Sequence, residues 1–146
     1  MAPLLRRRPP LPADALTAWE AFLACAGRLE AGRRVLLGTL PVGRVQPAPI
    51  ATGTEALRSA IDDVRVWMPD WRLDELDDEW AACGTALDRA AGELDAIDDI
   101  ATSTEELDDV LDPVRHLMDR LDAFADAEAA FRRRWRCPEP SEGTAG

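Results

Sequence analysis

The sequence predicts an all-α fold: a helical bundle of about four helices, the last two forming a long antiparallel hairpin. Its apolar residues recur at spacings of three and four, the period of an amphipathic helix. A strand would need alternation, and the only β-like run, residues 34–37, is short. The 146 residues suit one domain, and an apolar share of 47% supplies a core.

The first helix is expected over residues 13–37. Asp14 can cap its exposed amides, and Gly38 is suited to end it. Its apolar stripe consists of Leu16, Trp19, Phe22, Leu23, Ala26 and Leu29. Three glycines and three prolines lie in residues 38–53, so this stretch is predicted to be a loop.

The second helix is expected over residues 54–68. Thr52 or Thr54, followed by Glu55, forms a capping-box pattern at its start. Pro69 ends it, because the residue before a proline is disfavoured in helical conformation. Its apolar stripe consists of Leu57, Ile61, Val64 and Met68.

The third and fourth helices carry the clearest pattern and are expected over residues 71–100 and 103–136. Ser103 and Glu106 form a second capping box, and the short connection makes the two helices antiparallel. Pro113 predicts a kink unless the fourth helix begins after it. The third helix has a heptad-like stripe of Leu73, Leu76, Trp80, Cys83, Leu87, Ala90, Leu94 and Ile97. The fourth has Leu107, Val110, Val114, Leu117, Leu121, Phe124, Phe131 and Trp135.

Both ends of the chain are expected to be disordered around a single domain of residues 13–136. Residues 1–12 are rich in proline and arginine, and residues 137–146 form a polar tail. Arg6–Arg8 are not followed by the apolar segment of a signal peptide. No stretch is apolar enough to predict a membrane span, so a cytoplasmic protein is expected.

Several kinds of catalytic chemistry lack their residues, so neither enzymatic activity nor a bound cofactor or metal is expected. All 17 basic residues are arginine and tyrosine is absent, which excludes lysine Schiff bases and tyrosine acid–base catalysis. His116 is the single histidine. It shares a helix face with Asp112 and Asp119, but the stripe turns that face outward. The three cysteines have no metal-site or disulfide spacing: Cys25, Cys83 and Cys137.

The net charge of −11 is unevenly distributed. Residues 1–54 carry +4, residues 55–131 carry −17 and residues 132–146 carry +2. The acidic residues fill positions between apolar ones, which is typical of solvated helix faces. They also allow a surface that meets a basic partner or mimics nucleic-acid phosphates, with Asp74, Asp77 and Asp78 as candidates.

Arginine and tryptophan provide two further sets of candidate binding residues. Arg132, Arg133 and Arg134 can bind phosphates, an anionic membrane surface or the acidic part of a second copy. They equally suit the last turn of a helix, where cations meet the free carbonyls. Trp67 and Trp71 flank the turn after the second helix, either as a staple between helices or as an exposed anchor for a partner.

These patterns favour a non-enzymatic interaction or adaptor protein that binds a protein partner, or a second copy of itself, through the hairpin. The third and fourth helices outrun the second, so part of their stripe is expected to lack a cover. The alternative is an acidic mimic of nucleic acid, or an inhibitor, that occupies the basic groove of another protein. Direct binding of nucleic acid is not expected from either hypothesis.

Overall fold

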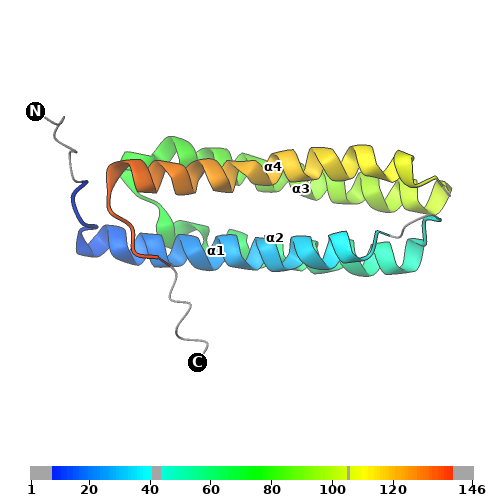
Figure 1. Ribbon diagram of the computed structural model, residues 1–146, viewed down its shortest axis with the longest axis horizontal. Coiled ribbons are helices and arrows are strands. Elements are labelled where there is room, and N and C mark those ends of the chain that lie inside the picture. Colours follow the sequence, from blue (N-terminus) through cyan, green and yellow to red (C-terminus); the bar gives the residue numbers. More distant parts are fainter. Residues whose placement is uncertain (1–7, 41–43, 105, 140–146) are drawn as a thin grey trace, which may run out of the picture.

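The computed structural model describes residues 8–40, 44–104 and 106–139, which form a four-helix bundle (Figure 1). The α-helices are α1 (Ala13–Gly38), α2 (Pro47–Trp67), α3 (Asp77–Ser103) and α4 (Leu107–Arg134). Two short 3-10 turns, η1 (Met68–Trp71) and η2 (Asp74–Leu76), connect α2 to α3. The described ranges contain no strand, only an isolated bridge between Pro10 and Arg136. The predicted all-α bundle is confirmed.

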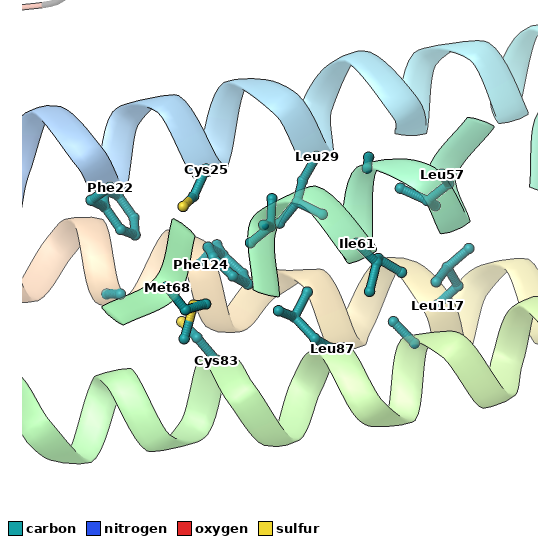
Figure 2. Close-up of a cluster of buried hydrophobic side chains, with 14 of the residues drawn as sticks. Phe22, Cys25, Leu29, Leu57, Ile61, Met68, Cys83, Leu87, Leu117 and Phe124 are labelled. Carbon is teal, nitrogen blue, oxygen red and sulfur yellow. The ribbon is translucent and has the colours of Figure 1, made fainter. Parts of the chain in front are cut away.

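Two antiparallel hairpins, α1–α2 and α3–α4, build the bundle, with α2 lying against α3 (Figure 1). The predicted stripe of the second hairpin faces inward, and its members Leu87, Ile97, Val110 and Leu117 are fully buried. Side chains from all four helices meet there (Figure 2). The expectation that part of this stripe lacks a cover is wrong for the described residues, because α1 and α2 run alongside it.

Aromatic rings fill the core at the end where α1 begins and α4 ends. The Phe22 ring centroid lies 5.3 Å from that of Trp71 and 5.4 Å from that of Phe131. Trp19 stands 5.2 Å from Phe131, and Trp135 closes the cluster at 6.1 Å from the same ring. These side chains bring η1 and the last turns of α4 onto α1, each pair adding to the burial of apolar area.

Two glycines let α1 and α2 approach closely. A Cβ atom on Gly53 would lie 2.8 Å from the Cα of Leu36, and one on Gly32 would lie 3.0 Å from the Cα of Leu57. The backbone of the facing helix can therefore approach each glycine closely, whereas a larger residue there would push the two helices apart. The first hairpin is held tightly as a result.

The predicted loop over residues 38–53 is too long, since α2 begins at Pro47. Pro47 and Pro49 both fall in the first turn, where the backbone N–H has no partner within the helix. The capping box is therefore wrong. Thr54 lies in the interior of α2 with its side chain buried.

Other predicted helix ends shift by a few residues. Asp14 lies in the first turn of α1 without capping it, and α3 begins at Asp77, after η1, which contains Pro69, and η2. At the start of α4 the hydroxyl of Thr104, one residue after the expected Ser103, accepts the Glu106 N–H at 3.0 Å. α4 continues through Pro113, which lacks the N–H for one helical hydrogen bond.

The described parts of both termini lie against the bundle. The Arg136 N–H donates to the carbonyl oxygen of Pro9 at 2.9 Å, and Trp19 Nε1–H donates to that of Pro138 at 3.1 Å. The remaining terminal residues predicted to be disordered, 1–7 and 140–146, lie outside the described ranges. None of the described helices combines the length and apolarity needed to cross a bilayer.

Candidate protein-binding groove between α1 and α4

Beyond the aromatic cluster, α1 and α4 leave an open groove of about 360 Å³ between them. Its apolar base includes Leu29 and Phe124, whose side chains are almost wholly buried. Small side chains on both helices, Ala26 and Ala125, leave room above this base. The remaining lining residues are Glu30, Arg33, Met118, Leu121, Asp122 and Glu128.

Packing on either side explains why the groove is open. The rings of Trp19, Phe22 and Phe131 separate α1 from α4 at one end of the bundle. Gly32 and Gly53 draw α1 towards α2 instead. Alanines cannot span the distance that the rings set, so the middle of the α1–α4 boundary stays unfilled.

The charges of the groove are predominantly acidic. The Arg33 guanidinium donates to both carboxylate oxygens of Glu30, at 2.8 and 2.7 Å, and reaches the sulfur of Met118 at 4.0 Å. These hydrogen bonds hold the pKa of Glu30 below its ordinary value. The Arg33 charge is thus matched within α1. The carboxylates of Asp122 and Glu128 remain on the other wall, the latter 3.5 Å from Arg132.

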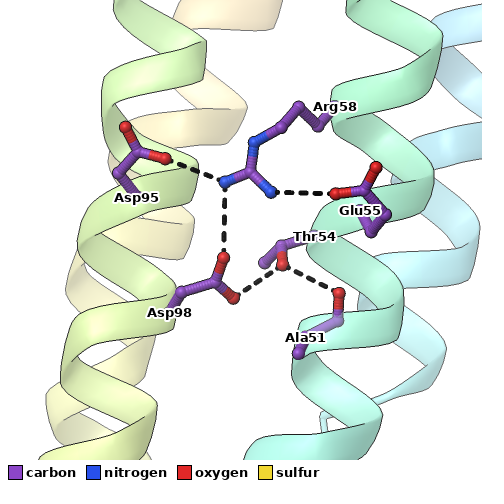
Figure 3. Close-up of polar contacts among 6 residues, drawn as sticks. All are labelled: Ala51, Thr54, Glu55, Arg58, Asp95 and Asp98. Carbon is purple, nitrogen blue, oxygen red and sulfur yellow. Dashed lines mark hydrogen bonds and ion pairs between the residues drawn. The ribbon is translucent and has the colours of Figure 1, made fainter.

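The α2–α3 interface, by contrast, is closed by a polar network (Figure 3). The buried Thr54 hydroxyl donates to Asp98 Oδ1 at 2.6 Å, and Arg58 donates to Asp98 at 3.3 Å and to Asp95 at 2.9 Å. Burial disfavours the charged guanidinium, but hydrogen bonds to Asp98, Asp95 and Glu55 together raise the pKa of Arg58. A partner cannot enter between these helices without breaking the network.

The tryptophans predicted to bind a partner lie at the aromatic end of the bundle. Trp71 is fully buried in the aromatic cluster, so its ring is not offered to a partner and the exposed-anchor interpretation fails for it. Trp67 is half-buried against the core. Trp80 Nε1–H donates to the Met68 carbonyl at 2.9 Å, and the Arg72 guanidinium stands 4.6 Å above the Trp80 ring. Trp71 therefore packs η1 onto α1 and α4, and Trp80 joins the start of α3 to η1.

The acidic candidates are exposed, Asp74 in η2 and Asp77 and Asp78 in the first turn of α3. Asp77 accepts a hydrogen bond from Arg72 at 3.0 Å. Nearby acidic residues on α3 pair similarly with α2, as Asp88 does with Arg65 at 2.8 Å. Part of the negative charge therefore joins helices within the bundle.

The arginine run differs from residue to residue. Arg132 lies 5.1 Å above the Trp19 ring and 3.3 Å from Glu139, so it ties the C-terminal segment to α1. Arg133 and Arg134 are exposed in the last turn of α4. There they complement the free carbonyls of the helix.

The residues that could carry reaction chemistry are dispersed. Burial raises the pKa of Cys25 to about 11 and that of Cys83 to about 12, which keeps both thiols protonated at neutral pH. His116 is exposed, with Nδ1 4.0 Å from a carboxylate oxygen of Glu93 rather than paired with Asp112 or Asp119. In the part of the chain described, no three His, Cys, Asp or Glu side chains are grouped to hold a metal ion.

Sequence reasoning missed the groove. Glu30 and Arg33 are spaced as an ion pair along one helix, and this pattern predicts local pairing only. The facing of Ala26 and Ala125 depends on which helices are neighbours and how far apart they stand. Comparisons of the chain with protein-family models, curated proteins and solved structures find no match.

Proposed function

We propose that this chain is a non-enzymatic interaction protein that binds a helical segment of a protein partner in the α1–α4 groove. The observation that carries this is the groove itself, a depression with an apolar base between α1 and α4. One of its walls, α4, belongs to the hairpin that sequence patterning favours as the binding element. Grooves of this kind accept the apolar face of an amphipathic helix.

The charge of the groove indicates the chemistry of the partner. Arg33 is hydrogen-bonded to Glu30, and the nearby Asp122 carboxylate on the α4 wall also helps to raise the pKa of Arg33. The lining therefore holds three carboxylates, those of Glu30, Asp122 and Glu128, and one guanidinium. A segment with apolar residues on one face and arginine or lysine beside them fits both features. Charge adds orientation and association rate, and apolar burial supplies the affinity.

A synthetic amphipathic helical peptide of about 20 residues, with leucines on one face flanked by arginines, tests the proposal. The expected result is saturable binding by fluorescence anisotropy, weakened about tenfold or more by Ala125→Arg, which fills the groove and reduces its negative charge. The matched control is Ala81→Arg, on an exposed position of α3 away from the groove. It should leave the affinity within about twofold of wild type.

The acidic-mimic hypothesis makes a different prediction for the same peptide. Binding to the outer acidic faces would fall steeply with rising salt, and Ala81→Arg would weaken it as much as Ala125→Arg. Equal effects of the two variants would reject the groove as the binding site. Equal binding of a peptide with glutamates in place of the arginines would reject a basic partner.

A further inference from the structure

The outward face of α1 carries a second heptad stripe, opposite the one in the core. Its members are all exposed and follow spacings of four and three: Ala13, Thr17, Glu20, Ala24, Gly27, Ala31, Arg34 and Gly38. Leu16 and Val35 flank it with 37% and 47% of their surface exposed. Leu37 is also exposed, so α1 holds three of the four exposed large apolar side chains in the described ranges.

The outward face of α4 shows what a solvated helix of this bundle looks like. It is dominated by charge, with Asp108, Asp112, Arg115, Asp119, Asp126 and Arg133 exposed along it. The stripe on α1 contains only two charged residues, Glu20 and Arg34. A helix that carries few charges on both faces is typical of one with both faces covered, and no described residue covers the outward face of α1.

The two charges of this stripe are arranged to complement a second copy. Glu20 and Arg34 each lie seven residues from Gly27, on opposite sides. In an antiparallel pair of α1 helices with its two-fold axis near Gly27, each Glu20 comes within one helical turn of Arg34 of the other copy. A parallel pair would instead bring Glu20 against Glu20 and Arg34 against Arg34, which is repulsive.

The side chains at these positions are exposed to solvent, although Arg34 also donates to Glu30 within its own helix. The Arg34 side chain is 77% exposed, and its nearest carboxylate, Glu30 at 3.2 Å, already receives two hydrogen bonds from Arg33. Glu20 forms no ion pair with any described residue. Open space lies above Gly27, where a Cβ atom would meet nothing within 4 Å. Ala24 and Ala31 beside it let two helix backbones approach closely.

We propose that two copies of this chain associate through the outward faces of their α1 helices, antiparallel about a two-fold axis near Gly27. Gly27 then faces Gly27 of the other copy, Ala24 packs near Ala31, and two Glu20–Arg34 pairs flank the centre. This face is distinct from the α1–α4 groove, so dimerisation does not depend on partner binding there.

A charge-reversal cycle on the full chain tests the proposal, with the dissociation constant measured by analytical ultracentrifugation. Wild type should show a concentration-dependent dimer with a dissociation constant of about 10 µM. Glu20→Arg and Arg34→Glu should each weaken the dimer about tenfold or more, because both place like charges together. The double variant should return to within about threefold of wild type, since it restores both pairs.

Two matched controls separate this interface from general charge effects. Asp62→Arg on α2 and Arg133→Glu on α4 make the same charge changes at exposed positions, and the dimer should be unaffected. Circular dichroism checks that every variant is folded. The proposal is overturned if wild type stays monomeric at about 1 mM, or if the controls weaken the dimer equally. A double variant that fails to recover would exclude the antiparallel arrangement.

Discussion

The two hairpins of the bundle meet along two boundaries that are built differently. At the α2–α3 interface, Arg58 bridges helices by hydrogen bonds to Asp95 and Asp98, and the Thr54 hydroxyl lies buried beside it. In the α1–α4 groove, Arg33 donates to a carboxylate of its own helix and reaches α4 at the sulfur of Met118. Arg58 closes its boundary because its acceptors Asp95 and Asp98 lie on the neighbouring helix. Arg33 does not, because its acceptor Glu30 lies on its own helix.

The largest expected effect is on the pH dependence of stability, which tests whether water enters the core through the groove. Cys25 and Cys83 lie in that core with Phe124, whose ring forms part of the groove base (Figure 2). Burial raises their pKa values to about 11 and about 12. The unfolded chain loses these protons at lower pH than the folded chain, so stability present below about pH 9 is lost as the pH rises. Each thiol should remove about 1.4 kcal/mol per pH unit in this range.

Urea unfolding of the reduced protein at a series of alkaline pH values measures this slope. The chain has neither lysine nor tyrosine to titrate there, so the thiols dominate. Cys25→Ala with Cys83→Ala should remove most of the slope, whereas Cys137→Ala, at a less buried site, should remove little. A wild-type slope equal to that of the double variant would show that the groove hydrates the core.

Arginine truncation compares the two boundaries directly. Arg58→Ala should lower the free energy of unfolding by about 1.5–3 kcal/mol, because it leaves the half-buried Asp98 carboxylate without its cation. Arg33→Ala should cost less than about 1 kcal/mol, since it loses an exposed pair within one helix. Thermal or urea unfolding by tryptophan fluorescence measures both. Equal losses would contradict the contrast between a closed and an open boundary.

The Thr54 hydroxyl sharpens the comparison at the level of one atom. Thr54→Val keeps the shape of the side chain but removes the donor to Asp98, and should destabilise the protein by about 1–2 kcal/mol. Thr52→Val is the control on the same helix, where the hydroxyl reaches only the Ala48 carbonyl at an exposed site. It should change stability by less than about 0.5 kcal/mol. The prediction fails if both variants lose the same stability.

The stripe of the second hairpin was predictable from sequence and the groove was not. Leu87, Leu94 and Leu117 recur with the helical period, and each buried position is implied by its neighbours along the same helix. The groove depends on the distance between Ala26 and Ala125. That distance is set by the aromatic rings at one end of the bundle and by Gly32 and Gly53, which draw α1 towards α2.

Errors at α2 and at the tryptophan corner have similar causes. Pro47 and Pro49 predict a loop from sequence, although the first turn of a helix needs no N–H from them. Whether Trp71 points inward depends on its contacts with Phe22 of α1 and Phe131 of α4. The residues next to Trp71 in the sequence do not reveal these contacts.

The smallest expected effect compares the two faces of α1 through its glycines. Gly27 faces open space, so Gly27→Ala should raise stability by about 0.5–1 kcal/mol, by limiting the freedom of the unfolded backbone. Gly32→Ala should lower it instead, because the new Cβ would lie 3.0 Å from the Leu57 backbone. Urea unfolding at about 1 µM protein keeps association from adding to either value. Opposite signs at two positions five residues apart would show that α1 is tightly packed only on its inward side. A loss of stability at both would mean that its outward face is already covered in the monomer.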